Sequence, residues 1–387
     1  MVFSRFNIFE DSQEYSVVFN TFNKVVTVLS DQDSQKLRLD LKSKVSIGEG
    51  LGKFLVEKGV LISKDEDELQ KLMQKNHNNK DILNLYLVPT NKCNLNCRYC
   101  FMKSNPSCSD SADLVSDTVE FLKDNVHKYN GINIVWFGGE PLLAIDKMEE
   151  ITSALKNEIE QNIFYSSTVI TNGVLLDQAN VLRLQEIGVK RVQIVVDCML
   201  LGNDEYSSFG YEKFYSNIKN VCGKMETILR VDYENIERAE VKSLFEDLIK
   251  SGYGDKVQIY LSSRNGAELS RAREYFDSII HALKKVVAMG MKYAYSVYNP
   301  SLACAVVYDG HYIVDSCGNI YKCALQIGKP QESVGTLKEG IEEDRLSKWQ
   351  LMNAFTETSC MSCSIYDTCK NNKDAKRWGL GLVNILV

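Results

Sequence analysis

Three cysteines, Cys93, Cys97 and Cys100, lie within eight residues of one another in the spacing C-x3-C-x2-C. Three thiolates so close in the sequence can bind one iron–sulfur cluster, but they leave one corner of a four-iron cluster without a protein ligand. That iron is open to a ligand other than protein, as a catalytic metal site requires. A zinc site and a chance grouping are the alternatives. The spacing disfavours zinc, because structural zinc motifs usually join C-x2-C to a second pair.

Hydrophobic patterns around this triplet alternate between strands and helices. Strands are expected at residues 83–88, 133–136, 167–171, 191–196, 228–231 and 257–261, and helices at residues 113–126, 147–162, 177–186, 211–222, 238–250 and 271–289. Six such β/α units in sequence predict a parallel sheet with helical crossovers, as an open sheet or a partial barrel. Chemistry in such folds lies in the loops after the strands, and the triplet follows the first strand.

The composition indicates a protein of two or three domains. The chain has 387 residues, of which 44% are hydrophobic, and a formal net charge of −6. This charge gives no reason to expect nucleic acid as a partner. Residues 1–10 lack the apolar run of a signal peptide, and no stretch reaches the roughly 18 apolar residues of a membrane span, so we expect a cytoplasmic protein with no membrane partner. In the reducing cytosol, twelve cysteines favour metal or catalytic roles over structural disulfides.

Residues 1–80 form a separate pattern, which predicts a small N-terminal domain. Strands are expected at residues 15–20, 24–30 and 59–62, with helices at residues 47–58 and 66–74 and a polar linker at residues 75–81. This order resembles a winged-helix-like α+β domain; a domain that only packs on the rest of the protein is the alternative. The expected domains are therefore residues 1–80, residues 81–299 with the β/α units, and residues 300–387, where cysteines are dense again.

The cysteine run and three later motifs together resemble the radical S-adenosylmethionine (SAM) superfamily. Residues 138–141 (Gly-Gly-Glu-Pro) follow the second predicted strand, residues 171–173 (Thr-Asn-Gly) follow the third, and Asp197 ends the fourth. The resemblance covers residue 83 to the end and implies a partial (β/α)6 TIM-like barrel. It also implies that the open iron binds the amino and carboxylate groups of SAM. One electron from the cluster then cleaves SAM to a 5′-deoxyadenosyl radical that abstracts hydrogen from the substrate.

The same resemblance assigns roles to individual residues. The glycine loop and its glutamate are expected near the methionine amine, the threonine–asparagine pair near the ribose or carboxylate, and two aromatic residues around the cluster. Arg230 is expected to pair with the SAM carboxylate, unless it is an ordinary surface arginine. The cofactor-binding set is Tyr99, Phe101, Gly138, Gly139, Glu140, Thr171, Asn172, Asp197 and Arg230, and the catalytic cluster ligands are Cys93, Cys97 and Cys100.

A second group of cysteines resembles the SPASM extension, which binds auxiliary iron–sulfur clusters. Its members are Cys304, Cys317, Cys323, Cys360, Cys363 and Cys369. Lys373 stands where the resemblance expects a further cysteine. Since two complete four-iron clusters need eight ligands, at least one cluster is absent, keeps an open iron, or uses another ligand such as Asp367. A zinc site at these cysteines is the alternative.

The combination resembles radical SAM maturases of ribosomally made peptides. Such an oxidoreductase-type enzyme makes thioether or carbon–carbon crosslinks or epimerises residues. The implied partners are a precursor peptide, whose leader adds a strand to the N-terminal domain, and an electron donor such as flavodoxin or ferredoxin. A sulfatase-maturase-like activity is disfavoured, because Ala324 replaces the acidic residue expected after Cys323. A small-molecule radical SAM enzyme and a non-catalytic iron–sulfur electron-transfer or scaffold protein remain alternatives.

Overall fold

A computed structural model describes the chain in two units, each taken here by itself. One unit comprises residues 1–78, 298–304 and 353–372, and the other residues 79–297, 305–352 and 373–387. The described residues are 1–4, 7–11, 15–20, 25–30, 32–35, 37, 49–68, 82–97, 100, 102, 109–158, 163–197, 210–262, 278, 281–282, 285–293 and 310–350. The domain limits expected at residues 80 and 300 stay predictions.

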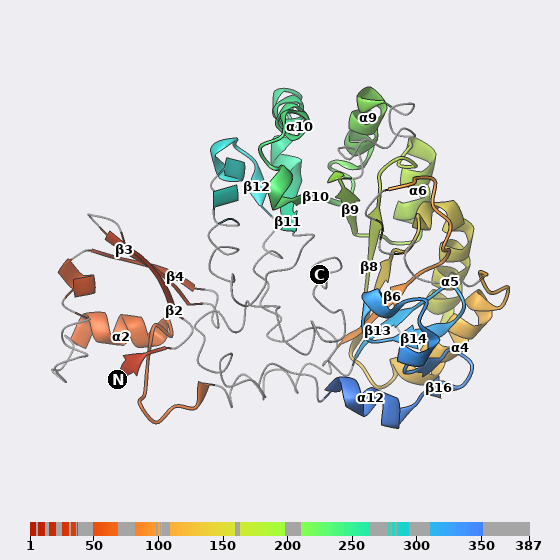
Figure 1. Cartoon of the computed structure of the whole chain (residues 1–387), viewed down its shortest axis with the longest axis horizontal. Helices are drawn as coiled ribbons and strands as arrows, with labels where there is room; N and C mark the ends of the chain where they lie inside the picture. The colour runs from red at the N-terminus through yellow and green to blue at the C-terminus, as the bar shows by residue number, and fades with distance from the viewer. Residues whose placement is uncertain are drawn as a thin grey trace. The chain divides into compact units, whose positions relative to one another are not determined.

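A parallel sheet is the centre of the larger unit. Its strands run in chain order: β6 (Ile82–Leu87), β7 (Gly131–Trp136), β8 (Phe164–Thr171), β9 (Arg191–Val195), β10 (Glu226–Asp232), β11 (Val257–Ser262) and β12 (Lys292–Tyr293). The connections contain α4 (Leu114–Val126), α5 (Ile145–Glu158), α6 (Gln178–Glu186), α9 (Tyr211–Val221) and α10 (Ala239–Lys250), which lie along one side of the sheet (Figure 1). The six predicted strands and five of the predicted helices are confirmed to within a few residues at their ends. Most of the helix predicted at 271–289 lies outside the described residues. The predicted curvature of the sheet into a partial barrel stays a prediction.

Apolar side chains cover both faces of this sheet, which explains the nearly continuous hydrophobic strands in the sequence. On β6, Leu83 and Leu85 are fully buried on one face. On the other face Tyr86 packs in a cluster of buried residues that also contains Val88, Val135, Phe137, Ile313, Tyr321, Ala324 and Ile327. Trp136 is fully buried, and its indole N–H donates to Ser167 Oγ at 3.0 Å. The sheet therefore has a packed scaffold beneath the loops that follow its strands.

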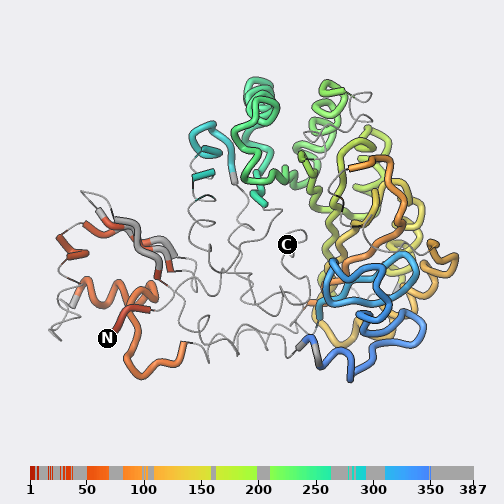
Figure 2. The backbone as a smooth tube through the Cα atoms, in the orientation of Figure 1, coloured from red at the N-terminus to blue at the C-terminus, as the bar shows by residue number. Residues whose placement is uncertain are grey.

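The sheet extends beyond the predicted units at both edges. β13 (His311–Val314) pairs with β6 in parallel, and β14 (Asn319–Tyr321), β15 (Gly335–Thr336) and β16 (Gly340–Ile341) follow as antiparallel neighbours. These strands and α12 (Glu343–Gln350) form the blue segment beside β6 (Figure 2). The six predicted strands correspond to β6 to β11, and the added strands were missed. The added strands have two to four residues, too few for a hydrophobic period to be visible in the sequence.

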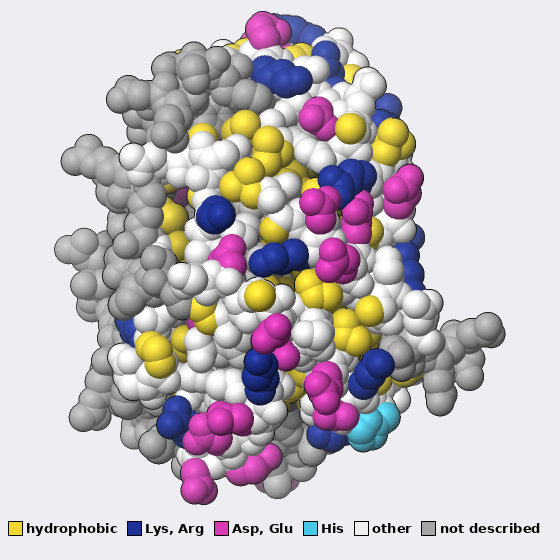
Figure 3. Space-filling view, turned by 90° about the vertical axis from the view of Figure 1, so that its right-hand side faces the viewer, with side chains coloured by type: hydrophobic (Ala, Val, Ile, Leu, Met, Phe, Trp, Pro, Cys, Tyr) yellow, Lys and Arg dark blue, Asp and Glu magenta, His cyan; other side chains and the backbone are white. Residues whose placement is uncertain are grey.

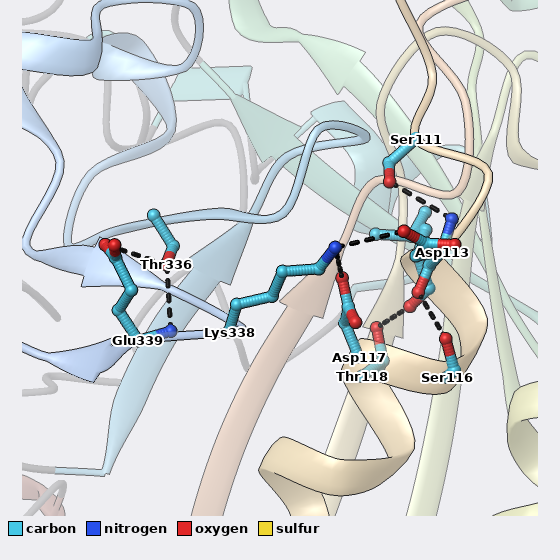
Figure 4. Close-up of polar contacts among 9 residues, drawn as sticks. Ser111, Asp113, Ser116, Asp117, Thr118, Thr336, Lys338 and Glu339 are labelled. Atoms are coloured by element: carbon cyan, nitrogen blue, oxygen red, sulfur yellow. Dashed lines mark hydrogen bonds and ion pairs between the residues drawn. The ribbon is translucent and has the colours of Figure 1, made fainter.

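A surface contact joins this C-terminal extension to α4. Lys338 Nζ, in the turn between β15 and β16, lies 3.0 Å from Asp113 Oδ2 and 3.7 Å from Asp117 Oδ2 (Figure 4). Lys338 and Asp113 are exposed, whereas Asp117 is mostly covered, so the ion pair between Lys338 and Asp113 positions the turn more than it stabilises the fold. Short 3-10 helices complete the unit: η2 (Pro141–Ala144), η3 (Tyr233–Asn235), η4 (Gly254–Lys256), η8 (Ala324–Gln326) and η9 (Pro330–Glu332).

The smaller unit has an antiparallel sheet, a helix and a second strand pair. The sheet order is β2 (Asn7–Asp11), β3 (Tyr15–Asn20), β4 (Val25–Ser30); α2 (Glu49–Glu57) follows, and β1 (Val2–Phe3) pairs with β5 (Leu61–Ile62). Its core contains Val18, Leu29, Leu37, Leu55, Val60 and Leu61. The predicted strands at 15–20, 24–30 and 59–62 and the helix at 47–58 are confirmed in outline, whereas β1 and β2 were missed. The winged-helix-like character and the helix at 66–74 stay predictions, since most of residues 66–74 lies outside the described part.

The face that Figure 3 shows is not dominated by side chains of one charge sign. Basic and acidic side chains are interspersed there with scattered apolar ones. Among the described residues, no helix has the length and apolar character needed to cross a membrane.

Candidate functional site

The three clustered cysteines lie on one loop that begins directly after β6. Cys93 is exposed, Cys97 and Cys100 are half-buried, and all three are free thiols. The Cys100 N–H donates to the Cys97 carbonyl at 3.3 Å, and the Leu95 N–H donates to Cys93 Sγ at 3.4 Å. Desolvation by the surrounding protein, with smaller contributions from Glu140, Cys97 and Cys100, raises the pKa of Cys93 to about 11, although the hydrogen bond from the Leu95 N–H lowers it. A nearby positive charge, such as that of iron, would favour the thiolate of Cys93.

The donor set of this loop suits an iron–sulfur cluster. A four-iron cluster spreads its protein ligands, because each thiolate binds a different iron. Three free thiols on one loop supply three of those ligands.

The glycine loop after β7 packs directly against the start of the cysteine loop. Gly138 has φ of +129°, which favours glycine, and a Cβ there would lie 2.5 Å from Val88. A Cβ on Gly139 would lie 2.1 Å from the Lys92 carbonyl oxygen. The Gly139 N–H donates to the Thr90 carbonyl at 3.3 Å. The two glycines therefore permit a close approach to the chain just before Cys93, and the expected approach to the methionine amine stays a prediction.

Glu140 is fully buried and connects three segments. Its backbone N–H donates to the Lys92 carbonyl at 2.8 Å. Its carboxylate accepts hydrogen bonds from the Leu142 N–H at 3.1 Å, the Thr171 hydroxyl at 2.8 Å and the Asn172 N–H at 2.9 Å. Burial raises its pKa to about 7, against the three hydrogen bonds, which lower it. Both carboxylate oxygens thus bind the protein itself, and contact with the SAM amine remains a prediction.

Asp197 and Arg230 lie at neighbouring strand ends. Asp197 Oδ2 accepts from the Asp232 N–H at 2.9 Å, and Oδ1 accepts from Asn235 Nδ2 at 2.6 Å, so Asp197 fixes the loop after β10. Arg230 lies within β10 with 9% of its surface exposed. The alternative that Arg230 is an ordinary surface arginine is therefore wrong. Its pairing with the SAM carboxylate stays a prediction.

The structure places only some of the remaining predicted residues. Tyr99, Phe101, Cys304, Cys360, Cys363 and Cys369 lie outside the described residues. Cys323 is a buried free thiol. Cys317 is disulfide-bonded, and a disulfide sulfur is no thiolate, so ligation of iron by Cys317 would require its reduction first.

Sequence reasoning missed one carboxylate beside the cysteine loop. Asp110 accepts hydrogen bonds from the Thr90 hydroxyl at 2.6 Å and the Asn91 N–H at 3.1 Å. Although partial burial opposes it, these bonds lower the pKa of Asp110. An isolated aspartate in a polar stretch carries no signal of this contact. Asp110 therefore anchors the chain between β6 and Cys93 in a way that only the fold reveals.

Comparison with known proteins agrees with this geometry. Residues 87–200, which hold the cysteine loop and the motifs up to β9, match the radical SAM superfamily. This chain contains a radical SAM domain. The match ends before β10, so the superfamily assignment does not by itself cover Arg230 or the C-terminal cysteines.

Sequence relatives of the radical SAM domain differ in their reactions. The chain is 26% identical over 182 residues to the radical SAM cyclopropyl synthase TigE of Paramaledivibacter caminithermalis, covering 40% of this chain and 38% of that protein. It is 34% identical over 107 residues to the PqqA peptide cyclase of Granulibacter bethesdensis, covering 27% and 26%. It is 30% identical over 159 residues to a probable GTP 3′,8-cyclase of Methanocaldococcus jannaschii, covering 40% and 50%. The matches thus span half or less of each relative.

Solved structures share the fold of the radical SAM domain and more. The enzyme anSMEcpe with bound AdoMet superposes with a TM-score of 0.56 at 15% identity, covering 75% of this chain and 88% of that one. Streptococcus suis SuiB bound to S-adenosylmethionine superposes with a TM-score of 0.51 at 15% identity, covering 100% and 98%. These likenesses show that the α/β fold with its parallel sheet is shared with both solved structures.

Proposed function

We propose that this protein binds a four-iron cluster through Cys93, Cys97 and Cys100 and cleaves SAM reductively to start radical chemistry. The observation that carries the proposal is the packing of the glycine loop onto the cysteine loop, with three free thiols beside it. The cluster, when bound, supplies the electron that cleaves SAM. The residues of the chain hold the three sulfurs, bring the backbone of Gly138 and Gly139 close to them, and offer Arg230 for the SAM carboxylate.

The test is SAM cleavage by the reconstituted protein. Under anaerobic conditions with a strong reductant, the wild type should release 5′-deoxyadenosine, measured by liquid chromatography and mass spectrometry. The triple variant of Cys93, Cys97 and Cys100 to Ala should release none. Cys222 supplies the control, because it is a buried free thiol outside the cysteine loop, at the C-terminal end of α9. Cys222→Ala should keep the activity. Retained cleavage in the triple variant would refute the proposal.

We infer that the substrate is a ribosomally made peptide. The support is the PqqA peptide cyclase relative and the structure of anSMEcpe with a bound peptide, which shares this fold with a TM-score of 0.55. The proposed product is a peptide with a thioether or carbon–carbon crosslink, or with an epimerised residue. The test incubates the protein with SAM, reductant and short peptides encoded beside its gene. A mass change that needs all three components supports a peptide substrate, and no change in any such peptide speaks against it.

We propose that a peptide leader binds the N-terminal sheet. In the described residues its order is β2–β3–β4, so β2 and β4 each have one edge without a strand beside it. A leader can add a strand to such an edge through backbone hydrogen bonds. Proline removes one backbone donor, and donors alternate between the two sides of a strand. Proline is therefore substituted at each position of β2 and of β4 in turn, and leader binding is measured by fluorescence anisotropy. In the edge strand that pairs with the leader, proline should weaken binding at alternate positions, and in the other edge strand it should leave binding unchanged.

Auxiliary clusters are the part of the proposal that the C-terminal cysteines carry. The proposed ligands are Cys304, Cys323, Cys360, Cys363 and Cys369, joined by Cys317 once its disulfide is reduced. Iron measured in the Cys93, Cys97 and Cys100 triple variant counts only auxiliary clusters. Iron near zero in that variant would leave the radical SAM cluster alone, whereas three to eight irons would indicate one or two further clusters. A flavodoxin or ferredoxin is the expected electron donor in a cytoplasmic setting.

A small-molecule substrate is the second candidate function. The GTP 3′,8-cyclase relatives match at 30 to 32% identity, and the match covers as much as 50% of their length, against 26% of the peptide cyclase. GTP conversion to a new product in the same assay would favour this candidate over peptide modification.

A further inference from the structure

The side-chain amide of Asn172 faces the Cys93 sulfur, and its orientation is fixed by its other contacts. Asn172 Oδ1 accepts a hydrogen bond from the Val174 N–H at 2.9 Å. The opposite end of the amide, Nδ2, must then face the cysteine loop, which removes the usual ambiguity between amide oxygen and nitrogen. Nδ2 lies 2.8 Å from Asn94 Oδ1 and 3.9 Å from Cys93 Sγ. An N–H donor is thus aimed at a cluster ligand.

The backbone of Asn172 is held as firmly as its side chain. Its N–H donates to Glu140 Oε2 at 2.9 Å, and the Thr171 hydroxyl donates to Glu140 Oε1 at 2.8 Å. Asn172 is buried, and Glu140 is fully buried. Little conformational freedom remains to be lost when the amide donates to sulfur, so the donor is preorganised. A chain of contacts runs from the Gly-Gly-Glu loop through Asn172 to the cluster loop.

We propose that Asn172 is a positioning residue of the iron–sulfur cluster, which orients the Cys93 sulfur and raises the reduction potential of the cluster. Reduction adds negative charge to the irons and sulfurs, and a hydrogen-bond donor stabilises the more negative state more strongly. The Leu95 N–H, 3.4 Å from the same sulfur, adds a second donor. Asn172 then serves the cluster rather than the SAM ribose. The proposal rests on the cluster of the radical SAM domain and is independent of a peptide substrate.

The experiment is a redox titration of the reconstituted protein followed by electron paramagnetic resonance. The signal that changes when SAM is added reports the cluster at Cys93 and separates it from auxiliary clusters. In Asn172→Ala we expect unchanged iron content and an equilibrium constant for one-electron reduction that is lower by about tenfold, a shift of ~59 mV to more negative potential. If no wild-type signal responds to SAM, the proposed SAM binding fails and this proposal fails with it.

Asn217→Ala is the matched control. Asn217 Nδ2 donates to the Gly173 and Val174 carbonyls at 2.9 and 2.8 Å, so the variant loosens the same turn without removing the donor beside Cys93. Its potential should stay at the wild-type value. An unchanged potential in Asn172→Ala, or an equal shift in Asn217→Ala, would overturn the proposal.

Asn94→Ala decides the matter if Asn172→Ala does not retain iron. Asn94 Oδ1 is the second partner of Asn172 Nδ2 and lies 4.0 Å from Cys93 Sγ. Removing this oxygen leaves the amide N–H to the sulfur and removes a lone pair beside the thiolate. Both changes favour the reduced cluster, so the potential should rise. An unchanged or lower potential in Asn94→Ala would contradict the proposed role of Asn172.

Discussion

Substituting Gly139 by alanine tests whether the contact between the glycine and cysteine loops carries the function. The added Cβ would lie 2.1 Å from the Lys92 carbonyl oxygen, where atoms essentially never approach within 3.0 Å, so this carbonyl must retreat by about 0.9 Å. That movement stretches the 2.8 Å hydrogen bond from the Glu140 N–H beyond its normal range. Overpacking and the lost hydrogen bond together cost about 2–4 kcal/mol. The strain falls on the residue that precedes Cys93.

The assays for Gly139→Ala are thermal unfolding, iron content after anaerobic reconstitution, and 5′-deoxyadenosine release. A misplacement of about 1 Å near a reacting centre costs on the order of a hundredfold in rate. We therefore expect at least that loss of SAM cleavage, with lowered iron content. Gly50→Ala is the control, because a Cβ there meets nothing within 4 Å and alanine favours the helix. Wild-type iron content and cleavage in Gly139→Ala would refute the reasoning that the loops must touch.

Three further predictions concern buried polar groups. The pKa of Glu140 is raised from 4.5 to about 7, so its contribution to the unfolding free energy should be lost as the pH rises from 4.5 to 7. Glu140→Gln should flatten that part of a plot of unfolding free energy against pH. Burial and the charge of Lys322 lower the pKa of His311 from 6.5 to about 3, so stability should fall as pH drops from 6.5 towards 3, and less so in His311→Phe. Asn20 Nδ2 donates to the Gly59 carbonyl at 2.9 Å and to two side chains, so Asn20→Ala should lower the unfolding free energy by about 1–3 kcal/mol in urea titration, whereas an effect below the error would contradict the role of this network.

The central strands of the sheet could be predicted from the sequence because each is a run of apolar residues. β6 to β11 have runs of Ile, Leu and Val separated by helical patterns, and each run was found at its expected place. β13 has only four residues and follows a stretch without a preceding helix pattern, so nothing separates it from a loop. It forms because its backbone pairs with β6. Pairing across more than two hundred residues leaves no local trace in the sequence.

The sequence identifies the residues of the candidate site, whereas the contacts among them become visible only in the fold. The cysteine spacing and the Gly-Gly-Glu and Thr-Asn-Gly motifs identify which side chains matter. Glu140 was expected near the SAM amine, a contact that stays a prediction; its carboxylate binds Thr171 and Asn172. Asn172 was expected near the ribose or carboxylate of SAM, which also stays a prediction; its amide faces Cys93. A motif specifies residue types at strand ends; which neighbour each side chain meets depends on the loops of two other strands.

The register of the sheet explains why these motifs meet. Leu87 pairs with Trp136, and Trp136 pairs with Val169. The loops after β6, β7 and β8 therefore all leave the sheet at the carboxyl ends of its parallel strands. A slip of one residue in β7 would move the glycine loop by about 3.3 Å and turn its side chains to the other face. The buried Trp136, held by Ser167, opposes such a slip. The apolar core of β7 thus fixes the distance between Glu140 and the cysteine loop, and stability of the sheet and geometry of the radical SAM site are one property of the same residues.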